Sequence, residues 1–282
     1  MGCCECFIHN MWVSFIMSKL FLYLVDYYIY VMIKYNLDNI AFLLIVKLDS
    51  IERLENTIHT VNFLNRYFDT EIHLWEISTF SNGIIQKIIP GSVKYRFYED
   101  LDPILHRTRY LNEMIDSVNT KYISVWDVDV VTPINQITDA VAYLKQGYDF
   151  VYPYDKFFLD TTDEIRRMYM KSDGDIDLLT EFSDFMIRLY LPNPVGGAFF
   201  ANRLSYIESG KENETFYGWG FEDGERYNRW INKGYSIKKI AGPLFHLTHP
   251  RGVNSHITNP DLTLIKKREL LSSLKRTPND GK

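Results

Sequence analysis

The chain has 282 residues, of which 46% are hydrophobic and 15% aromatic, so it can bury a large core in one large domain or two small ones. Its formal net charge is -5 and its basic residues are scattered, which argues against nucleic acid as a main partner because a basic footprint is missing. All three cysteines lie between Cys3 and Cys6, so the remainder has no disulfide, as expected in a reducing compartment.

Residues 1–32 form an apolar and aromatic extension that precedes the globular pattern. No charge-free run in it reaches the ~18 residues of a confident membrane span. Asp26 would add roughly 2.5–3.5 kcal/mol against insertion. A signal-peptide cleavage site is also missing. The extension is a poor membrane anchor, an interfacial membrane-associated segment, or a non-native start ahead of Met32, and we favour the last two.

Strand and helix patterns alternate over the first 130 residues. The apolar run Ile40–Val46 predicts a buried strand, and the helix after it begins at a cap formed by Asp49 or Ser50. Further strands are predicted at Glu71–Glu76, Val93–Tyr98 and Tyr122–Val131, with a helix over His106–Asn119 between the last two. This alternation predicts a parallel α/β sheet that binds ligands beyond the carboxyl ends of its strands.

The pattern is looser after Pro133. We expect a helix over Ile137–Lys145, a short strand over Asp149–Pro153 and a final amphipathic helix over Leu262–Leu274. The acidic stretch Asp160–Arg188 predicts helical pieces, and an insertion or an acceptor-side lobe would account for it. No linker or repeat interrupts the pattern, so residues 33–282 are expected to form a single domain.

Two carboxylates end the strand that is predicted over Tyr122–Val131, namely Asp127 and Asp129. Acidic groups at the end of a buried strand are costly unless a cation lies between them. Carboxylate oxygens suit Mg²⁺ or Mn²⁺, which often bridges a protein carboxylate to a phosphorylated substrate. Taken alone, the D-x-D spacing fits two solvated aspartates at a strand end at least as well.

A glycine-rich aromatic segment, Gly218–Asp223, precedes a predicted helix. Trp219 offers a flat apolar face of the kind that stacks on a sugar ring. Glu222 and Asp223 would lie in the first turn of the helix, where its dipole favours carboxylates, and a carboxylate beside a sugar hydroxyl can act as a general base. A plain acidic helix start beside a core tryptophan is the structural alternative.

Two histidines three residues apart, His246 and His249, lie in an apolar context near the end of the pattern. Imidazole can supply nitrogen ligands to a manganese site that already holds an aspartate and phosphate oxygens. Arg251, two residues later, is a candidate contact for phosphate. The glycine pair Gly196-Gly197 is a further point where backbone and ligand could approach closely, or an ordinary turn.

These segments occur in an order that resembles a known family. The order is Asp127-Val128-Asp129, Gly196-Gly197-Ala198, Gly218-Trp219-Gly220-x-Glu222-Asp223 and a late histidine. It resembles the GT-A glycosyltransferases related to the β-1,4-galactosyltransferases, and the carboxyl-terminal part also resembles the polypeptide N-acetylgalactosaminyltransferases. His106–Asn112 is similar to the family's N-R-x-x-L-N segment. The resemblance covers roughly Ile40 to Gly252 and implies a single-domain GT-A fold, a Rossmann-like α/β arrangement with a mostly parallel central sheet flanked by helices.

The resemblance also implies roles for individual residues. Asp129 would bind the metal, Mn²⁺ or Mg²⁺, together with His246 or His249, because the two related families align differently there. Asp127 and Arg107 would contact the donor nucleotide or its diphosphate. Gly197, Trp219 and Glu222 would line the donor and sugar sites, and Asp223 would be the catalytic base of an inverting enzyme. The family's first loop carries arginines where Leu48 and Ser50 stand here, so Asp49 is a candidate donor contact instead.

The implied function is transfer of a sugar from a nucleotide sugar, a UDP-sugar by analogy, to a glycan or lipid-linked acceptor. A retaining transferase of the same fold and a non-catalytic sugar-binding module are the alternatives. A two-carboxylate hydrolase and a nucleotidyltransferase are more distant rivals. We expect a cytoplasmic enzyme of bacterial surface-glycan or capsule synthesis. Peripheral association with the inner face of the membrane would suit a lipid-linked acceptor.

Overall fold

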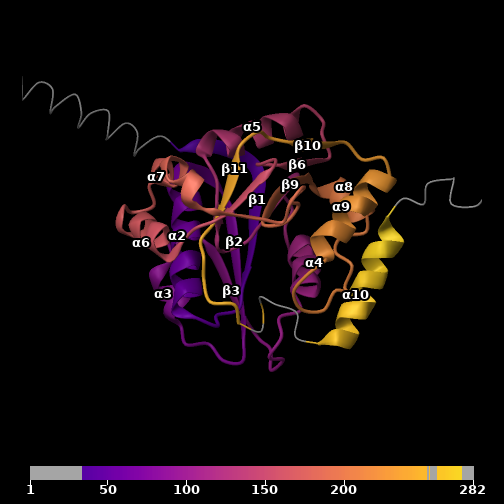
Figure 1. The fold of residues 1–282 in the computed structure, drawn as a ribbon, viewed down its shortest axis with the longest axis horizontal. Helices are drawn as coiled ribbons and strands as arrows, with labels where there is room; N and C mark the ends of the chain where they lie inside the picture. Colours follow the sequence, from indigo (N-terminus) through magenta and orange to yellow (C-terminus); the bar gives the residue numbers. More distant parts are fainter. Residues whose placement is uncertain (1–33, 253, 255–258, 275–282) are drawn as a thin grey trace, which may run out of the picture.

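The computed structural model describes residues 34–252, 254 and 259–274, which form a layered α/β fold with helices on both sides of a central sheet (Figure 1). The expected extension over residues 1–32 lies outside the described residues. Within the part of the chain that is described, no helix is both long and apolar enough to cross a membrane.

The larger sheet has seven strands in the order β10-β6-β9-β4-β1-β2-β3. Their bounds are Tyr35–Val46 (β1), Phe68–Ser78 (β2), Lys94–Glu99 (β3), Tyr122–Trp126 (β4), Phe150–Tyr152 (β6), Ala198–Asn202 (β9) and Ile237–Lys239 (β10). Neighbouring strands are parallel except at β9, which is antiparallel to both β4 and β6. The expected mostly parallel central sheet is therefore confirmed.

A smaller sheet has the strand order β5-β11-β7-β8. Its strands are Val130–Val131 (β5), Phe157–Asp160 (β7), Ile187–Leu189 (β8) and Pro243–His246 (β11). Strand β11 is parallel to β7 and antiparallel to β5. This pairing brings chain segments more than 80 residues apart to one edge, where His246 pairs with both Val130 and Asp160.

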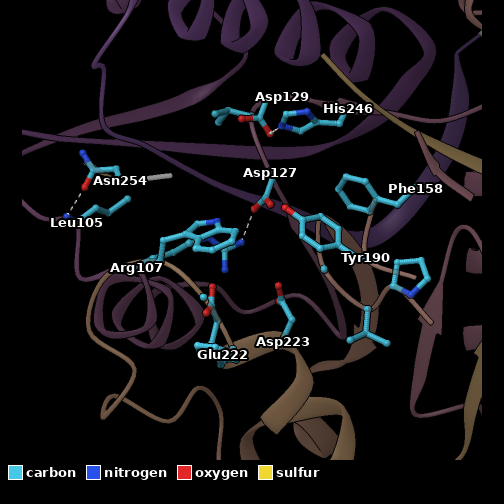
Figure 2. A pocket seen from close by; sticks show the side chains of 18 of the residues that line it. Leu105, Arg107, Asp127, Asp129, Phe158, Tyr190, Glu222, Asp223, His246 and Asn254 are labelled. Atoms are coloured by element: carbon cyan, nitrogen blue, oxygen red, sulfur yellow. Dashed lines mark hydrogen bonds and ion pairs between the residues drawn. The ribbon is translucent and has the colours of Figure 1, made fainter. Parts of the chain in front are cut away.

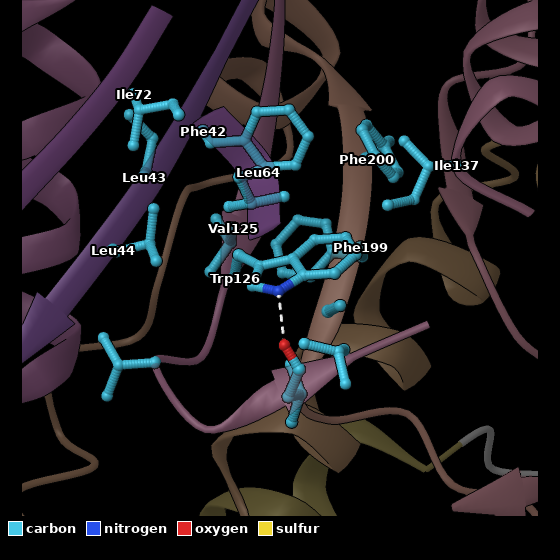
Figure 3. Close-up of a cluster of buried hydrophobic side chains, with 14 of the residues drawn as sticks. Phe42, Leu43, Leu44, Leu64, Ile72, Val125, Trp126, Ile137, Phe199 and Phe200 are labelled. Atoms are coloured by element: carbon cyan, nitrogen blue, oxygen red, sulfur yellow. Dashed lines mark hydrogen bonds between the residues drawn. The ribbon is translucent and has the colours of Figure 1, made fainter. Parts of the chain in front are cut away.

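The prediction of one continuous strand over Tyr122–Val131 is wrong. Strand β4 ends at Trp126, residues 127–129 turn, and β5 belongs to the smaller sheet. The Trp126 indole Nε1 donates to the Val130 carbonyl oxygen at 2.9 Å, which holds the turn closed (Figure 3). The two aspartates therefore lie in a turn between two sheets rather than on an extended strand.

Ten helical segments are described. They are Ile51–Tyr67 (α2), Ile84–Ile88 (α3), Arg107–Ser117 (α4), Ile134–Lys145 (α5), Asp163–Lys171 (α6), Ile176–Glu181 (α7), the 3-10 turn Ser183–Phe185 (η1), Arg203–Glu208 (α8), Glu222–Asn232 (α9) and Pro260–Ser273 (α10). Of the two expected caps of the first helix, Ser50 is the one used, since its side chain accepts a hydrogen bond from the Arg53 backbone nitrogen.

The core lies between the larger sheet and its helices. Strand β1 is buried from Ile40 to Val46, as expected for a parallel strand covered on both faces. The Phe42 ring packs edge-on against Trp126 and Phe200, with centroids 5.5 and 5.6 Å apart (Figure 3). This packing fixes the end of β4, from which the aspartate turn begins.

The acidic stretch Asp160–Arg188 begins at the end of β7, continues through α6, α7 and η1, and returns as β8. Figure 1 shows α6 and α7 beside α2. Arg166 of α6 fixes this position, because its guanidinium donates to the Asn56 side-chain oxygen at 2.8 Å and to Glu55 at 2.6 Å. The helical pieces predicted from the sequence are present, and strands β7 and β8 lie at the two ends of the stretch.

Candidate active site

A pocket of about 360 Å³ lies where the carboxyl ends of β1 and β4 meet the smaller sheet and the start of α9. Nine of the ten residues expected to form the site line it: Arg107, Asp127, Asp129, Gly197, Trp219, Glu222, Asp223, His246 and His249. The tenth, Asp49, does not line the pocket itself but forms an ion pair with the pocket residue Arg53. The location agrees with the rule for parallel α/β sheets.

Three of these residues are placed to hold a metal ion. The ligand atoms of Asp129, His246 and His249 lie within 4.8 Å of one another, and all three residues are buried. The Nε2 atom of His246 is 3.8 Å from Asp129 Oδ1, and that of His249 is 3.3 Å from Asp129 Oδ2. The sequence left open which histidine belongs to the site, and the structure places both there.

The electrostatics of the aspartate turn differ between its two carboxylates. Burial raises the pKa of Asp129, but His246, His249 and Arg53 outweigh it, so the pKa lies below the usual range. Burial raises the pKa of Asp127, the Arg107 guanidinium at 2.5 Å opposes this, and Asp129 adds to the rise. Asp129 is thus kept ionised, whereas burial and the neighbouring carboxylates outweigh the ion pair of Asp127 with Arg107.

Arg53 is a pocket residue that the sequence analysis missed. From the first turn of α2 it reaches Asp49 at 2.8 Å and Asp129 at 3.1 Å, and its Nη2 lies 3.3 Å from His249 Nε2. The available signal was the spacing of Asp49 and Arg53, four residues apart where the first helix begins. Such a pair supports a helix, and this helix starts at the carboxyl end of β1.

The opposite side of the pocket is acidic. Glu222 and Asp223 begin α9, and Figure 2 shows both carboxylates facing Asp127, with Asp129 and His246 beyond it. Arg226 holds Asp223 Oδ1 at 2.5 Å and is itself anchored by buried Glu212 at 2.9 Å. The Asp223 carboxylate is therefore fixed by an arginine one turn along the same helix.

Glu222 is 9% exposed, and its Oε2 atom has no hydrogen-bond partner within the described chain. Burial, followed by the nearby Asp223 charge, raises its pKa to about 7. A carboxyl group in such a setting can donate a hydrogen bond at neutral pH when it is protonated. It is a suitable partner for a sugar hydroxyl.

The glycine pair Gly196-Gly197 allows the aspartate turn and the Glu222-Asp223 pair to lie close together. A β-carbon at Gly196 would lie 2.5 Å from Asp223 Oδ2, so a side chain there would displace the carboxylate. Gly197 has φ +78°, and its carbonyl accepts the Asp127 backbone N–H at 2.8 Å. The glycines thus connect the aspartate turn to the Glu222-Asp223 pair.

Aromatic rings complete the walls. Trp219 lines the pocket, and its carbonyl oxygen accepts from the buried Lys266 Nζ of α10 at 2.9 Å. Phe158 of β7 and Tyr190, which follows β8, flank the acidic stretch and line another wall of the pocket, where their rings pack edge-on with centroids 5.0 Å apart (Figure 2). Neither residue was predicted, because none of the recognisable motifs contains or adjoins it.

Comparisons with known proteins also find similarity to glycosyltransferases. A family model described as the N-terminal domain of galactosyltransferase matches residues 177–251. The match includes the glycine pair, the Glu222-Asp223 pair and both histidines, but not the aspartate turn. In this segment the chain resembles the galactosyltransferases. No curated protein matches the sequence.

Solved structures agree in fold. The catalytic domain of Drosophila β1,4-galactosyltransferase 7 with xylobiose has a TM-score of 0.51 at 15% identity, covering 81% of this chain and 79% of that one. A mutant of that enzyme with manganese, UDP-Gal and xylobiose has a TM-score of 0.50 at 15% identity, with 80% and 79% covered. Mycobacterium tuberculosis glucosyl-3-phosphoglycerate synthase with Mn²⁺, UDP and phosphoglyceric acid has a lower TM-score of 0.48, at 15% identity, with 83% and 78% covered. The expected resemblance and the GT-A fold class are confirmed. The expected glycosyltransferase class of enzyme is supported by the family-model match over residues 177–251.

Proposed function

We propose that this chain transfers a sugar from a UDP-sugar to a hydroxyl group of a glycan or lipid-linked saccharide, with inversion and with Mn²⁺ or Mg²⁺. One observation carries the proposal: a single pocket places the Asp129, His246 and His249 set opposite the Glu222-Asp223 pair. The manganese and UDP-Gal bound by the related Drosophila enzyme support the choice of donor and metal.

The residues present fit a divalent ion. One carboxylate and two imidazoles form a donor set that suits Mn²⁺, and phosphate oxygens would complete the coordination. When bound, the ion would neutralise the charge that builds on the departing diphosphate. Asp129 supplies the anionic ligand, and its lowered pKa keeps that ligand ionised over the working pH range.

Two arginines near the aspartate turn are suited to the diphosphate. Arg53 and Arg107 both line the pocket and each is paired with an aspartate of the turn. Guanidinium groups bind phosphate oxygens through paired hydrogen bonds. We propose that these arginines bind the donor's diphosphate from either side of Asp127 and Asp129.

The acceptor hydroxyl would be activated by Asp223. Its Oδ1 atom is held by Arg226, so the proton would be accepted at the other oxygen, Oδ2, beside Gly196. Attack from this side, away from the diphosphate, inverts the configuration at the anomeric carbon. Glu222 would hold a sugar hydroxyl, and Trp219 would stack on a sugar ring.

The first prediction concerns Asp223→Asn. It removes the base but keeps the size of the side chain, so transfer should fall by at least about 10²-fold, while UDP-sugar binding measured by calorimetry stays nearly unchanged. Asp184→Asn, an exposed change in η1, is the charge-matched control. The assignment of the base would be refuted if Asp223→Asn lost donor binding but transferred sugar at the wild-type rate once the donor was bound.

The anomeric configuration of the product separates inversion from the retaining alternative. Proton NMR of the product formed from an α-linked UDP-sugar should show a β-linkage. An α-linkage would replace the proposed mechanism with a retaining one. Binding of sugars without any turnover of a UDP-sugar would favour the sugar-binding module.

We further propose a cytoplasmic location and a role in bacterial surface-glycan synthesis. The absence of cysteine after Cys6 supports a reducing compartment. Cell fractionation tests this, and recovery of the protein from an oxidising compartment would contradict it.

A further inference from the structure

The metal-centre histidine His246 has a charged partner on the side away from Asp129. Its Nδ1 atom lies 2.7 Å from Asp160 Oδ1, the last residue of β7. The two residues are direct partners in the parallel pairing of β7 with β11. The backbone reinforces the contact, because the Thr161 N–H donates to the His246 carbonyl at 3.0 Å.

This contact determines which ring nitrogen is available as a ligand. A carboxylate oxygen accepts, so the proton of a neutral His246 ring lies on Nδ1 and the lone pair on Nε2. Nε2 is the atom that faces Asp129, at 3.8 Å. His249 has the same arrangement, since its Nδ1 lies 2.8 Å from the Pro250 carbonyl oxygen and its Nε2 faces Asp129.

The segment around Asp160 is held in place from both sides. The Thr161 hydroxyl accepts the Thr248 backbone N–H at 3.0 Å. Asn56 of α2 donates to the Leu247 carbonyl at 2.6 Å and accepts from Arg166 of α6. The residues next to His246 are therefore tied to the start of the acidic stretch and to α2.

We infer that Asp160 is a positioning residue that fixes the tautomer and ring orientation of His246 and thereby sets the affinity of the centre for its metal. This inference rests on the proposed metal centre. A carboxylate behind a ligating imidazole orients the ring and makes it a stronger electron donor. The acidic stretch Asp160–Arg188 thus contributes its first residue to the metal centre.

The test is Mn²⁺ binding, followed by electron paramagnetic resonance, to the full chain without nucleotide or sugar. Asp160→Ala should raise the dissociation constant by about 10–100-fold. Asp160→Asn should raise it less, because an amide oxygen still accepts from Nδ1. Asp184→Asn, which removes one exposed charge of the same stretch, should leave it unchanged.

A double-mutant cycle separates positioning from a general charge effect. In a His246→Ala background Asp160→Ala should have little further effect, because the residue through which it acts is gone. Nitrogen-15 NMR of the imidazole rings should show His246 protonated at Nδ1 in the wild type and in a mixture of tautomers in Asp160→Ala.

Three outcomes would overturn the inference. They are an unchanged affinity in folded Asp160→Ala, an equal loss in both backgrounds, and a wild type that binds no Mn²⁺. A wild type that binds Mn²⁺ with the expected cycle but transfers no sugar would refute the proposed function and leave the inference standing.

Discussion

The environment of the Glu222 carboxyl group, which lines the pocket, disfavours ionisation. Its pKa rises from 4.5 to about 7, first because it is buried and then because Asp223 is adjacent. A group whose pKa is higher in the folded state contributes stability that is fully present below the unfolded pKa. That contribution is lost as pH rises through the folded pKa. The relevant window is therefore from pH 4.5 to about pH 7.

We predict that Glu222→Gln removes this pH dependence. The amide has the same shape and no charge, so the variant should match the wild type near pH 4.5 and exceed it above pH 7 by on the order of 3 kcal/mol. Urea unfolding at several pH values measures the difference. Parallel stability curves for the two proteins between pH 4.5 and 8 would show that Glu222 ionises without cost.

Arg53 shows why the site could be predicted only in part from single residues. The aspartates, the glycine pair, the Glu222-Asp223 pair and the histidines each belong to a short segment with a recognisable spacing. The local signal of Arg53 is limited to its spacing from Asp49, which indicates a helix and not a pocket, and Asp160 has no local signal. They reach the centre through a helix start and a strand pairing, from 76 residues before Asp129 and 86 residues before His246 respectively.

At the scale of elements, the segment Gly196-Gly197 before β9 connects the two sides of the pocket. A β-carbon at Gly197 would lie 2.7 Å from Leu244 Cδ2 and 2.9 Å from Phe158 Cε2, and its φ of +78° is one that L side chains rarely adopt. Both the crowding and the backbone conformation require glycine there.

We predict that Gly197→Ala destabilises the fold by roughly 1–3 kcal/mol, through strain and overpacking together. Gly91→Ala is the matched control, since Gly91 has nothing within 4 Å of a new β-carbon and no positive φ. Chemical denaturation of both variants measures the effect. Equal midpoints for the two would mean that the segment before β9 adapts freely.

Strands β1, β2 and β3 and helices α2 and α4 could be predicted because their signals are local. Buried parallel strands are continuous apolar runs, as in β1, and Ser50 is a recognisable helix cap. The break after Trp126 could not be predicted, because the hydrophobic run continues through Val128 and Val130 while the hydrogen bonds change sheets. The pairing of β7, β8 and β11 depends on contacts between residues far apart in sequence. The periodicity of hydrophobic residues does not indicate such contacts.

In the molecule as a whole, carboxylate, imidazole and guanidinium groups from separate elements meet at one edge of the two sheets. The aspartate turn comes from β4, the histidines from β11 and the segment after it, and the acid pair from α9. Arg107 at the start of α4 and Arg53 of α2 supply positive charge between them. In the proposed mechanism, donor binding, metal binding and proton transfer all depend on this gathering of acids, imidazoles and arginines around one pocket.

UDP release from a panel of UDP-sugars, with Mn²⁺, with Mg²⁺ and with EDTA, by the wild type and by His246→Ala, tests whether these groups act together. We predict slow release from one UDP-sugar that requires a divalent ion, is abolished by EDTA and is strongly reduced in His246→Ala. Release that continues unchanged in EDTA, or the absence of binding to every UDP-sugar with either metal, would refute the proposed metal-dependent transfer.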